Sequence, residues 1–250
     1  MTTAAVFGST GAVGSQILAT LLASDAVSSV KTVSRRLPTA QSSKLQALEE
    51  GDISKWAGMI ASLSPKPSVV FNAVGTTRAA AGGTENQWKI DHDSCVENAR
   101  AAREAGVKTY VYISSGGTRG FLSSYVPYSK MKIGVEDTIK ELGFENAIIL
   151  RPGMIIGRET SKAPMLENIV ESLSYLGQGV QDRIGMIPLI NTLSVARLNI
   201  NAPSAGQNQT TIGRAAVAAA LMATEGKAPS QYWVVEQADI VRLGRKEWKE

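Results

Sequence analysis

Two side chains that can handle a proton lie four residues apart in the stretch "YSKMK", at Tyr128 and Lys132. Residues i and i+4 lie on one face of a helix, so a phenol and an ammonium at this spacing can address the same ligand. A free phenol has a pKa of about 10, and a nearby ammonium favours the ionised form. The pair therefore predicts proton transfer to or from an oxygen atom, as in the reduction of a carbonyl by hydride. The alternative is a half-buried tyrosine beside a surface lysine.

Two serines end the apolar run "TYVYISS", which precedes this pair along the chain. A hydroxyl at the end of a strand can hydrogen-bond a substrate oxygen whose negative charge grows during reduction. Ser114 and Ser115 are therefore candidates for a third group that acts with the tyrosine and the lysine.

Gly8, Gly11 and Gly14 separate an apolar run from a helical pattern near the start of the chain. After a strand, a first glycine permits a sharp turn, a second lets the backbone approach a pyrophosphate, and a third lets the helix pack closely. The amino terminus of the helix adds free N–H groups and partial positive charge. The alternative is a tight turn that binds nothing. We expect a phosphate-binding loop made of Gly8, Ser9, Thr10, Gly11, Ala12, Val13 and Gly14.

The second expected strand ends in "VSRRLP". Folds that prefer NAD usually place Asp or Glu at this point to accept hydrogen bonds from the ribose, whereas arginine can bind a 2′-phosphate. Ser34, Arg35 and Arg36 therefore predict NADP(H), unless both arginines belong to a solvated loop. Further on, Asp52 and Ile53 either meet the adenine or begin the next helix, with Asp52 as its cap.

Apolar runs alternate with helical patterns through residue 151, as a parallel sheet covered on both faces requires. We predict an α/β fold, a doubly wound parallel sheet of the Rossmann type that binds ligands at the carboxyl ends of its strands. The expected strands are 4–7, 29–34, 68–74, 109–115 and 146–153, with 45–50 as a short additional strand. The expected helices are 12–24, 53–63, 84–106 and 128–143.

This alternation stops after Gly153. We expect residues 154–210 to be irregular, apart from a helix at 166–177, and to contribute mainly to the substrate pocket of a single NADP(H)-binding domain that spans 1–250. A strand-to-helix passage follows at 210–224. Several large side chains could line the pocket or belong to the core: Tyr125, Met154, Met165, Tyr175 and Trp233.

Composition narrows the classes of function. A net charge of +4 suits an anionic ligand and is too mild and scattered to predict a nucleic-acid partner. Cys95 is the single cysteine, so we expect a buried thiol, no metal site and a reducing compartment. The first apolar run begins at Ala4, which leaves no room for a leader peptide, and no run is long enough to span a membrane. Peripheral membrane contact stays open.

Taken together, the motifs resemble the short-chain dehydrogenase/reductase superfamily, in its atypical branch, over residues 4 to about 157. They are the glycine triplet, Asn72-Ala73-Val74-Gly75, Ser114-Ser115, Tyr128-x-x-x-Lys132 and Arg151-Pro152-Gly153. The stretch "VGTTRAAAGG", residues 74–83, resembles the Tat-interacting-protein oxidoreductase-like group and its fungal relatives, which are assigned to the mitochondrial outer membrane. The resemblance implies a location in the cytoplasm or at the periphery of that membrane.

The resemblance also implies a reaction. Hydride would pass between NADPH and a small or medium carbonyl or alcohol, with Tyr128 as proton donor and Lys132 as its partner. Ser115, thirteen residues before Tyr128 as is common in the superfamily, would orient the substrate, with Ser114, Arg78 and Met154 nearby. The implied nucleotide-binding residues also include Asn72, Ala73, Val74, Gly75, Tyr128, Lys132, Arg151, Pro152 and Gly153.

Several alternatives stay open. Arg78 could instead pair with a local acid, and His92, flanked by two acids, is expected to be solvated or to cap a helix. The superfamily often has an asparagine that holds a relay water, and Asp91 stands near that place. The chain could therefore be a nucleotide-binding sensor or partner-binding protein on the same fold. It could also be a dehydratase or isomerase without net redox change.

Overall fold

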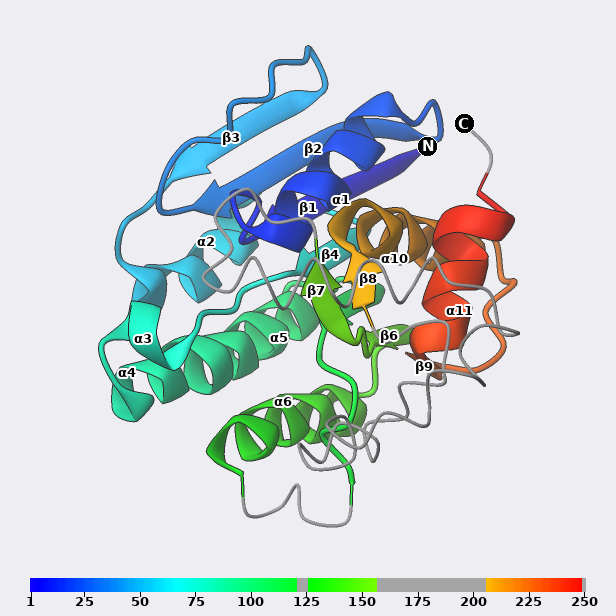
Figure 1. Ribbon diagram of the computed structural model, residues 1–250. Helices are drawn as coiled ribbons and strands as arrows, with labels where there is room; N and C mark the ends of the chain where they lie inside the picture. The colour runs from blue at the N-terminus through cyan, green and yellow to red at the C-terminus, as the bar shows by residue number, and fades with distance from the viewer. Residues whose placement is uncertain (121–125, 157–205, 249–250) are drawn as a thin grey trace, which may run out of the picture.

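Seven parallel strands form one sheet in the order β3–β2–β1–β4–β5–β6–β9 (Figure 1). The computed structural model describes residues 1–120, 126–156 and 206–248. The strand order runs outward from β1 in both directions, which confirms the doubly wound Rossmann-type fold. The strands are β1 (Thr2–Phe7), β2 (Val27–Ser34), β3 (Leu45–Glu49), β4 (Val69–Asn72), β5 (Thr109–Ile113), β6 (Asn146–Leu150) and β9 (Tyr232–Val235).

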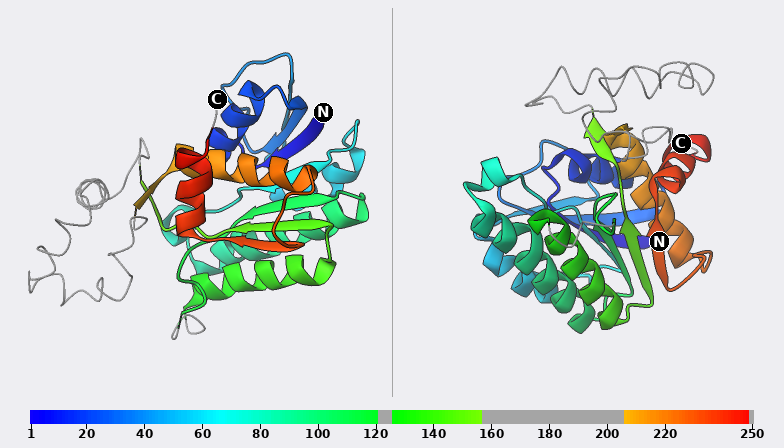
Figure 2. Two further views of the ribbon diagram at one scale, coloured as in Figure 1. Left: turned by 90° about the vertical axis from the view of Figure 1, so that its right-hand side faces the viewer. Right: turned by 60° about the horizontal axis from the view of Figure 1, so that its bottom comes forward.

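Helices cover both faces of this sheet, and Figure 2 shows α10 and α6 on opposite sides of it. One layer consists of α1 (Ala12–Ala23) and α10 (Gln209–Thr224), with α11 (Gln237–Val241) beside them. The other layer consists of α2 (Trp56–Ser62), α5 (Ser94–Glu104) and α6 (Pro127–Leu142).

The apolar strands serve two cores because alternate side chains point to opposite faces. Val6 packs in the core beneath α1 and α10, and its neighbour Phe7 packs in the core beneath α2, α5 and α6. Each fully buried aliphatic or aromatic side chain stabilises the fold by roughly 1.5–3 kcal/mol. Trp233 on β9 is only 6% exposed and belongs to the first core, so it does not line a pocket.

The expected helix over 84–106 is present in the structure, but one turn of it is π-helical instead of α-helical. It consists of α4 (Thr84–Trp88), a π-helical turn (Lys89–Asp93) and α5, which follow one another without a break. The wider π turn places Asp91 in a buried position. Such single turns often occur at functional sites.

Other elements were not expected from the sequence. They are α3 (Arg78–Ala81), α11, strand β9, and a small second sheet in which β7 (Met154–Ile156) pairs with β8 (Gly206–Asn208). Of the expected strand-to-helix passage at 210–224, the helix is confirmed as α10, whereas the strand lies just before this range, at β8. The expected helix at 166–177 and the side chains of Tyr125, Met165 and Tyr175 lie outside the described residues. No helix within the described ranges is long and apolar enough to cross a membrane.

The carboxyl ends of the strands meet at one edge of the sheet. Phe7 at the end of β1 is in register with Val33 and Asn72 on the flanking strands, and Ile113 on β5 is in register with Leu150 on β6. The segments that follow these strands contain the glycine loop, the two arginines, the serines and the Arg-Pro-Gly motif. We call this side of the sheet the carboxyl edge.

Candidate active site

The glycine loop after β1 makes a tight turn with close backbone contacts. Gly8 has a φ of 78°, and an added Cβ would lie 2.9 Å from the carbonyl carbon of Ala73. At Gly14, in the first turn of α1, an added Cβ would lie 2.1 Å from the carbonyl oxygen of Gly8. The first glycine therefore permits a turn against the neighbouring strand, and the third permits close packing of the helix.

Two buried serines connect this loop to the end of β2. The hydroxyls of Ser9 and Ser34 lie 3.1 Å apart, and that of Ser34 also donates to the carbonyl oxygen of Arg36 at 3.0 Å. Both hydroxyls are thus used within the protein. Arg35 and Arg36 are exposed at the carboxyl edge and form no ion pair with any residue in the described ranges.

Asp52 acts as a cap in the structure. Its Oδ1 accepts hydrogen bonds from the Ser54 hydroxyl at 2.7 Å and from the Ser54 N–H at 3.0 Å, at the start of the 3-10 turn Ile53–Lys55. These hydrogen bonds hold the pKa of Asp52 below its usual range. Of the two roles open from the sequence, the capping role is the one that the geometry shows.

Asn72, at the end of β4, shapes the turn that follows. Its buried amide donates to the Tyr110 Oη at 3.0 Å, and its Oδ1 accepts the N–H of Val74 at 3.1 Å. The Sγ of Cys95 lies 3.9 Å from the same Oδ1, and burial raises the pKa of this thiol to about 11. The buried thiol expected at Cys95 is confirmed.

Asp91 is a buried carboxylate with both oxygens engaged. Oδ1 accepts the N–H of Thr76 at 2.7 Å, and Oδ2 accepts from Nε2 of Gln87 at 3.1 Å. Burial raises the pKa of Asp91, although the charge of Lys132 and these hydrogen bonds act in the opposite direction. Asp91 therefore connects the π-helical turn to the loop after β4, and the positive charge of Lys132 stabilises its ionised form.

The structure brings Tyr128 and Lys132 together on α6. The Lys132 Nζ lies 6.0 Å from the centre of the Tyr128 ring, and it donates to the Tyr112 Oη at 3.1 Å and to the Ile113 carbonyl oxygen at 3.2 Å. Lys132 is 3% exposed, whereas Tyr128 is 36% exposed. The ammonium is therefore held inside the protein at the end of β5, and the phenol is open to a ligand.

The two serines at the end of β5 differ in availability. Ser114 is buried, and its hydroxyl donates to the Glu136 Oε1 at 2.6 Å. Ser115 is half-buried, and among the described residues its hydroxyl donates only at a long distance, 3.5 Å, to the Gly116 carbonyl oxygen. Ser115 is thus the serine whose hydroxyl can more readily meet a substrate oxygen.

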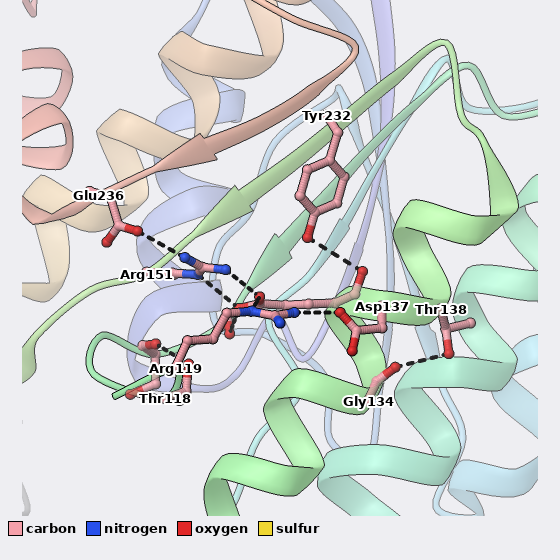
Figure 3. A network of polar contacts seen from close by, with 11 residues as sticks. Thr118, Arg119, Gly134, Asp137, Thr138, Arg151, Tyr232 and Glu236 are labelled. Atoms are coloured by element: carbon pink, nitrogen blue, oxygen red, sulfur yellow. Dashed lines mark hydrogen bonds and ion pairs between the residues drawn. The ribbon is translucent and has the colours of Figure 1, made fainter. Parts of the chain in front are cut away.

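An ion-pair network is centred on Glu136, the carboxylate that accepts from Ser114 (Figure 3). Glu136 of α6 is fully buried and accepts from Arg151 at 2.6 and 3.1 Å and from Arg119 at 3.1 Å. Arg151 also pairs with Glu236 at 2.9 Å, and Arg119 pairs with Asp137. Burial alone would raise the pKa of Glu136, but the hydrogen bonds from Arg151, Ser114 and Arg119 outweigh it and keep this pKa low.

This network gives the Arg151 guanidinium a structural role, since it joins α6 to the segment after β9. Sequence reasoning did not single out Glu136. A possible signal was its position four residues after Lys132, which places an acid on the buried face of α6.

The Arg-Pro-Gly segment is fixed through its backbone. The Pro152 carbonyl oxygen accepts the N–H of Gly116 at 2.6 Å, and the Gly153 N–H donates to the Gln207 Oε1 at 3.1 Å. The segments after β5 and β6 are thereby joined to each other and to β8. Met154, which follows, is 45% exposed.

Two further residues considered in the sequence analysis lie at the start of α3 and in the π-helical turn. Arg78 is exposed at the start of α3, where it lines a shallow depression with Ala79, Gly82 and Gly83. The His92 Nδ1 lies 2.8 Å from the Asp93 Oδ1, and its ring contacts that of Trp88 at 4.8 Å between centres with a tilt of 37°, as a structural side chain would. Among the described residues no cluster of acids, histidines and cysteine could hold a metal ion.

Comparison with known proteins defines the family. A model described as "NAD dependent epimerase/dehydratase family" matches residues 4–183. The chain is 75% identical over its whole length to protein fmp52-2, mitochondrial, of Aspergillus oryzae, all of which it covers. It is 49% identical to protein FMP52, mitochondrial, of Chaetomium globosum, over 98% of each chain. Both names agree with mitochondria, one of the two locations expected from the sequence, the other being the cytoplasm.

Solved structures share the fold at low sequence identity. MoeE5 in complex with UDP-glucose and NAD has a TM-score of 0.62 and 16% identity, with 97% of this chain and 81% of that chain covered. The UDP-Glc/GlcNAc 4-epimerase from Campylobacter jejuni has a TM-score of 0.63 and 13% identity, with coverage of 94% and 78%. The family model covers well over half of the chain, and this leads to one conclusion: the chain belongs to the NAD dependent epimerase/dehydratase family.

Proposed function

We propose that this protein is an NADP(H)-dependent oxidoreductase that interconverts a small or medium carbonyl and its alcohol, with Tyr128 as the proton donor. One observation above all supports this proposal. An accessible tyrosine lies beside a buried ammonium at the edge of the sheet where the glycine loop also ends. Phenol, ammonium and phosphate-binding loop are the parts that carbonyl reduction by a dinucleotide needs.

The residues present fit a dinucleotide. Any side chain at Gly8 or Gly14 would collide with neighbouring backbone, so the loop stays narrow. Helix α1 begins in this loop, and the N–H groups of its first turn are available to a phosphate. Thr10, Ala12 and Val13 complete this loop. The exposed guanidinium of Arg35, supported by Arg36, would bind a 2′-phosphate. Although the family is described as NAD dependent, β2 ends without a carboxylate that would repel this phosphate.

The remaining residues follow from this placement. Ser115 and Tyr128 would hydrogen-bond the carbonyl oxygen, and Lys132 would hold the nicotinamide ribose while its charge favours proton release from the phenol. A bound nicotinamide supplies or takes up the hydride. Water is kept from the inner side of Lys132 because the ammonium is buried against β5.

We propose a single domain in which the segment 154–210, with Met154 and Arg78, determines which carbonyl is accepted. We also propose a peripheral location at mitochondria, because the fungal relatives carry that word in their names.

A second reaction class deserves a test because the family description names epimerases and dehydratases. In such a reaction the same tyrosine would accept a proton from a substrate hydroxyl while hydride leaves and later returns. No NADPH is consumed overall in that case, so net consumption separates the two classes.

The experiment combines binding with turnover. NADPH and NADH are titrated by calorimetry, and a panel of carbonyl compounds is assayed at 340 nm with NADPH, with wild type and Tyr128→Phe in parallel. We expect the variant to keep its affinity for NADPH and to lose turnover by at least roughly 100-fold.

A matched lysine pair supplies the control. Lys132→Met should also lose turnover, whereas Lys130→Met, an exposed lysine on the same helix, should not. Full turnover in Tyr128→Phe would refute the assignment of the donor. Tight NADPH binding without turnover on any substrate would favour the sensor or the redox-neutral reaction.

A further inference from the structure

The inner side of Lys132 is closed by two consecutive residues of β5. The ammonium donates to the phenol oxygen of Tyr112 at 3.1 Å and to the carbonyl oxygen of Ile113 at 3.2 Å. The Nζ also lies 4.8 Å from the centre of the Tyr112 ring, so the side chain runs along that ring before it reaches the oxygen. Tyr112 is fully buried and was not singled out from the sequence.

The donor count of an ammonium gives this contact its meaning. Lysine has three N–H donors arranged as a tetrahedral fork and no acceptor. Two of them are directed to Tyr112 and Ile113. The third is left for the open side, where Tyr128 lies and where a ligand would bind. Removing the Tyr112 oxygen or the Ile113 carbonyl oxygen as an acceptor would let the ammonium group rotate and would leave one of its buried N–H donors without a hydrogen bond.

Both inner partners are uncharged, and this matters for the field at the site. Burial raises the pKa of Tyr112 well above its ordinary value, so its phenol stays protonated and neutral. A neutral acceptor satisfies a hydrogen bond without cancelling the positive charge. A carboxylate in the same place would form an ion pair and quench the field that Lys132 exerts on Tyr128.

The nearby carboxylate does not form this ion pair. Asp91, on the π-helical turn, has its two oxygens bonded to Thr76 and Gln87. The other titratable groups that surround the Tyr112 phenol are Cys95 on α5, Tyr110 on β5, and Tyr128 on α6, besides Lys132 itself. Of these, the lysine is the one cation.

We propose that Tyr112 is a positioning residue that holds the Lys132 ammonium through a neutral phenol, so that its third N–H and its full charge are directed at Tyr128 and the bound ligand. Its consequence for catalysis rests on the proposed function. The hydrogen bond itself can be tested without turnover. Tyr112 is not a catalytic residue, because it acts through Lys132.

The chain offers a matched pair of variants. Tyr112→Phe removes the phenol oxygen that binds Lys132 and keeps the ring. Tyr110→Phe removes the same atom two residues earlier on the same strand, where it accepts from Asn72 instead. Both variants lose one buried hydrogen bond, so thermal unfolding should show comparable losses of stability. Only the first should alter Lys132.

The first readout is the ammonium signal of Lys132 in an NMR spectrum of the full-length protein with ¹⁵N-labelled lysine. A buried, hydrogen-bonded ammonium exchanges its protons slowly, and the signal is assigned by its loss in Lys132→Met. We expect it to be present in the wild type and in Tyr110→Phe, and to be broadened or lost in Tyr112→Phe. An unchanged signal in Tyr112→Phe, or no protected signal in the wild type, would overturn the proposal.

The second readout is the pH dependence of carbonyl reduction. When the ammonium is displaced, its positive charge assists ionisation of the donor phenol less. The midpoint of the alkaline limb should therefore move up by about one pH unit in Tyr112→Phe. We also expect kcat to fall about tenfold with a smaller change in KM for the carbonyl. A drop in kcat without movement of the midpoint would mean a merely structural role and would overturn the proposal.

The two readouts separate this inference from the proposed function. If no carbonyl is reduced but the ammonium signal responds as expected, the proposed reaction fails and the contact between Tyr112 and Lys132 stands. If reduction is observed and the signal does not respond, the reaction stands and the positioning role fails.

Discussion

At the scale of single residues, neighbouring side chains of the same type have different tasks. Ser114 and Ser115 are adjacent, yet the first donates to buried Glu136 and the second is half-open at the carboxyl edge. Lys130 is exposed, while Lys132 is buried against β5. The exposure and hydrogen-bond partners of a side chain, rather than its type, therefore distinguish candidate catalytic residues from residues that stabilise the site.

Arg35 permits a test at this scale. Arg35→Ala should weaken NADPH by about tenfold to 100-fold and NADH only slightly, because a charge-assisted hydrogen bond to a phosphate contributes roughly 1.5–3 kcal/mol. Calorimetric titration of both nucleotides measures the ratio. Arg100→Ala, an exposed arginine on α5, is the control. Equal weakening of both nucleotides would show that Arg35 does not contact the 2′-phosphate.

At the scale of elements, α6 combines chemistry with anchorage. Tyr128, Lys132 and Glu136 follow one another at intervals of four residues on one face of this helix. Through Glu136 the helix is joined to Ser114 after β5 and to Arg151 after β6. The proposed Tyr128–Lys132 pair is therefore anchored to the carboxyl edge by the hydrogen bonds of buried Glu136 as well as by the helix.

The network gives a prediction for stability against pH. The pKa of Glu136 is lower in the folded protein, so its contribution is complete above the ordinary glutamate pKa, about 4.3, and is lost as the pH falls through the folded value. Glu136→Gln should lower the free energy of unfolding by about 3 kcal/mol at pH 7, because it leaves a buried guanidinium poorly paired. At more acidic pH the difference from the wild type should shrink.

Urea denaturation at pH 7 and in the acid range measures this effect. Glu141→Gln, on the exposed side of the same helix, is the control and should behave as the wild type does. A difference that stays constant across the acid range would show that the charge of Glu136 is not responsible.

At the scale of the whole molecule, the residues proposed to bind the nucleotide precede the segment proposed to select the substrate. Strand β7 ends at Ile156 and β8 begins at Gly206, and the two strands pair directly. The described residues on either side of 157–205 therefore lie close together. The glycine loop, Tyr128 and Lys132 all lie outside this range.

Replacing residues 157–205 by a flexible linker of about ten Gly and Ser residues tests this division, since such a linker easily spans two paired strands. We expect the shortened protein to bind NADPH with near-normal affinity and to lose turnover of its substrate. Circular dichroism confirms that the variant is folded. Loss of NADPH binding in a folded variant would show that the segment belongs to the nucleotide site instead.

Much of this arrangement follows from local patterns in the sequence. Continuous apolar runs predicted β1, β2, β4, β5 and β6, because strands buried on both faces need no alternation. Helical spacing placed Tyr128 and Lys132 on one face of α6, and the interval between Gly8 and Gly14 predicted the turn after β1. Each of these inferences needs only the periodicity of one element and its immediate neighbours.

What the tertiary structure alone decided depends on contacts between residues far apart in the chain. Lys132 donates to Tyr112, and Arg151 pairs with Glu136, because the folded sheet brings β5, α6 and β6 together. The periodicity of a single helix or strand does not predict which polar side chains will pair in this way. Strand β9 was missed because a run as short as "YWVV" becomes a strand only when the edge of β6 is there to pair with it. The sequence by itself thus determined five core strands and the placement of Tyr128 and Lys132 on one helix face, whereas long-range packing decided the edge strand β9 and which side chains hold Lys132 in place.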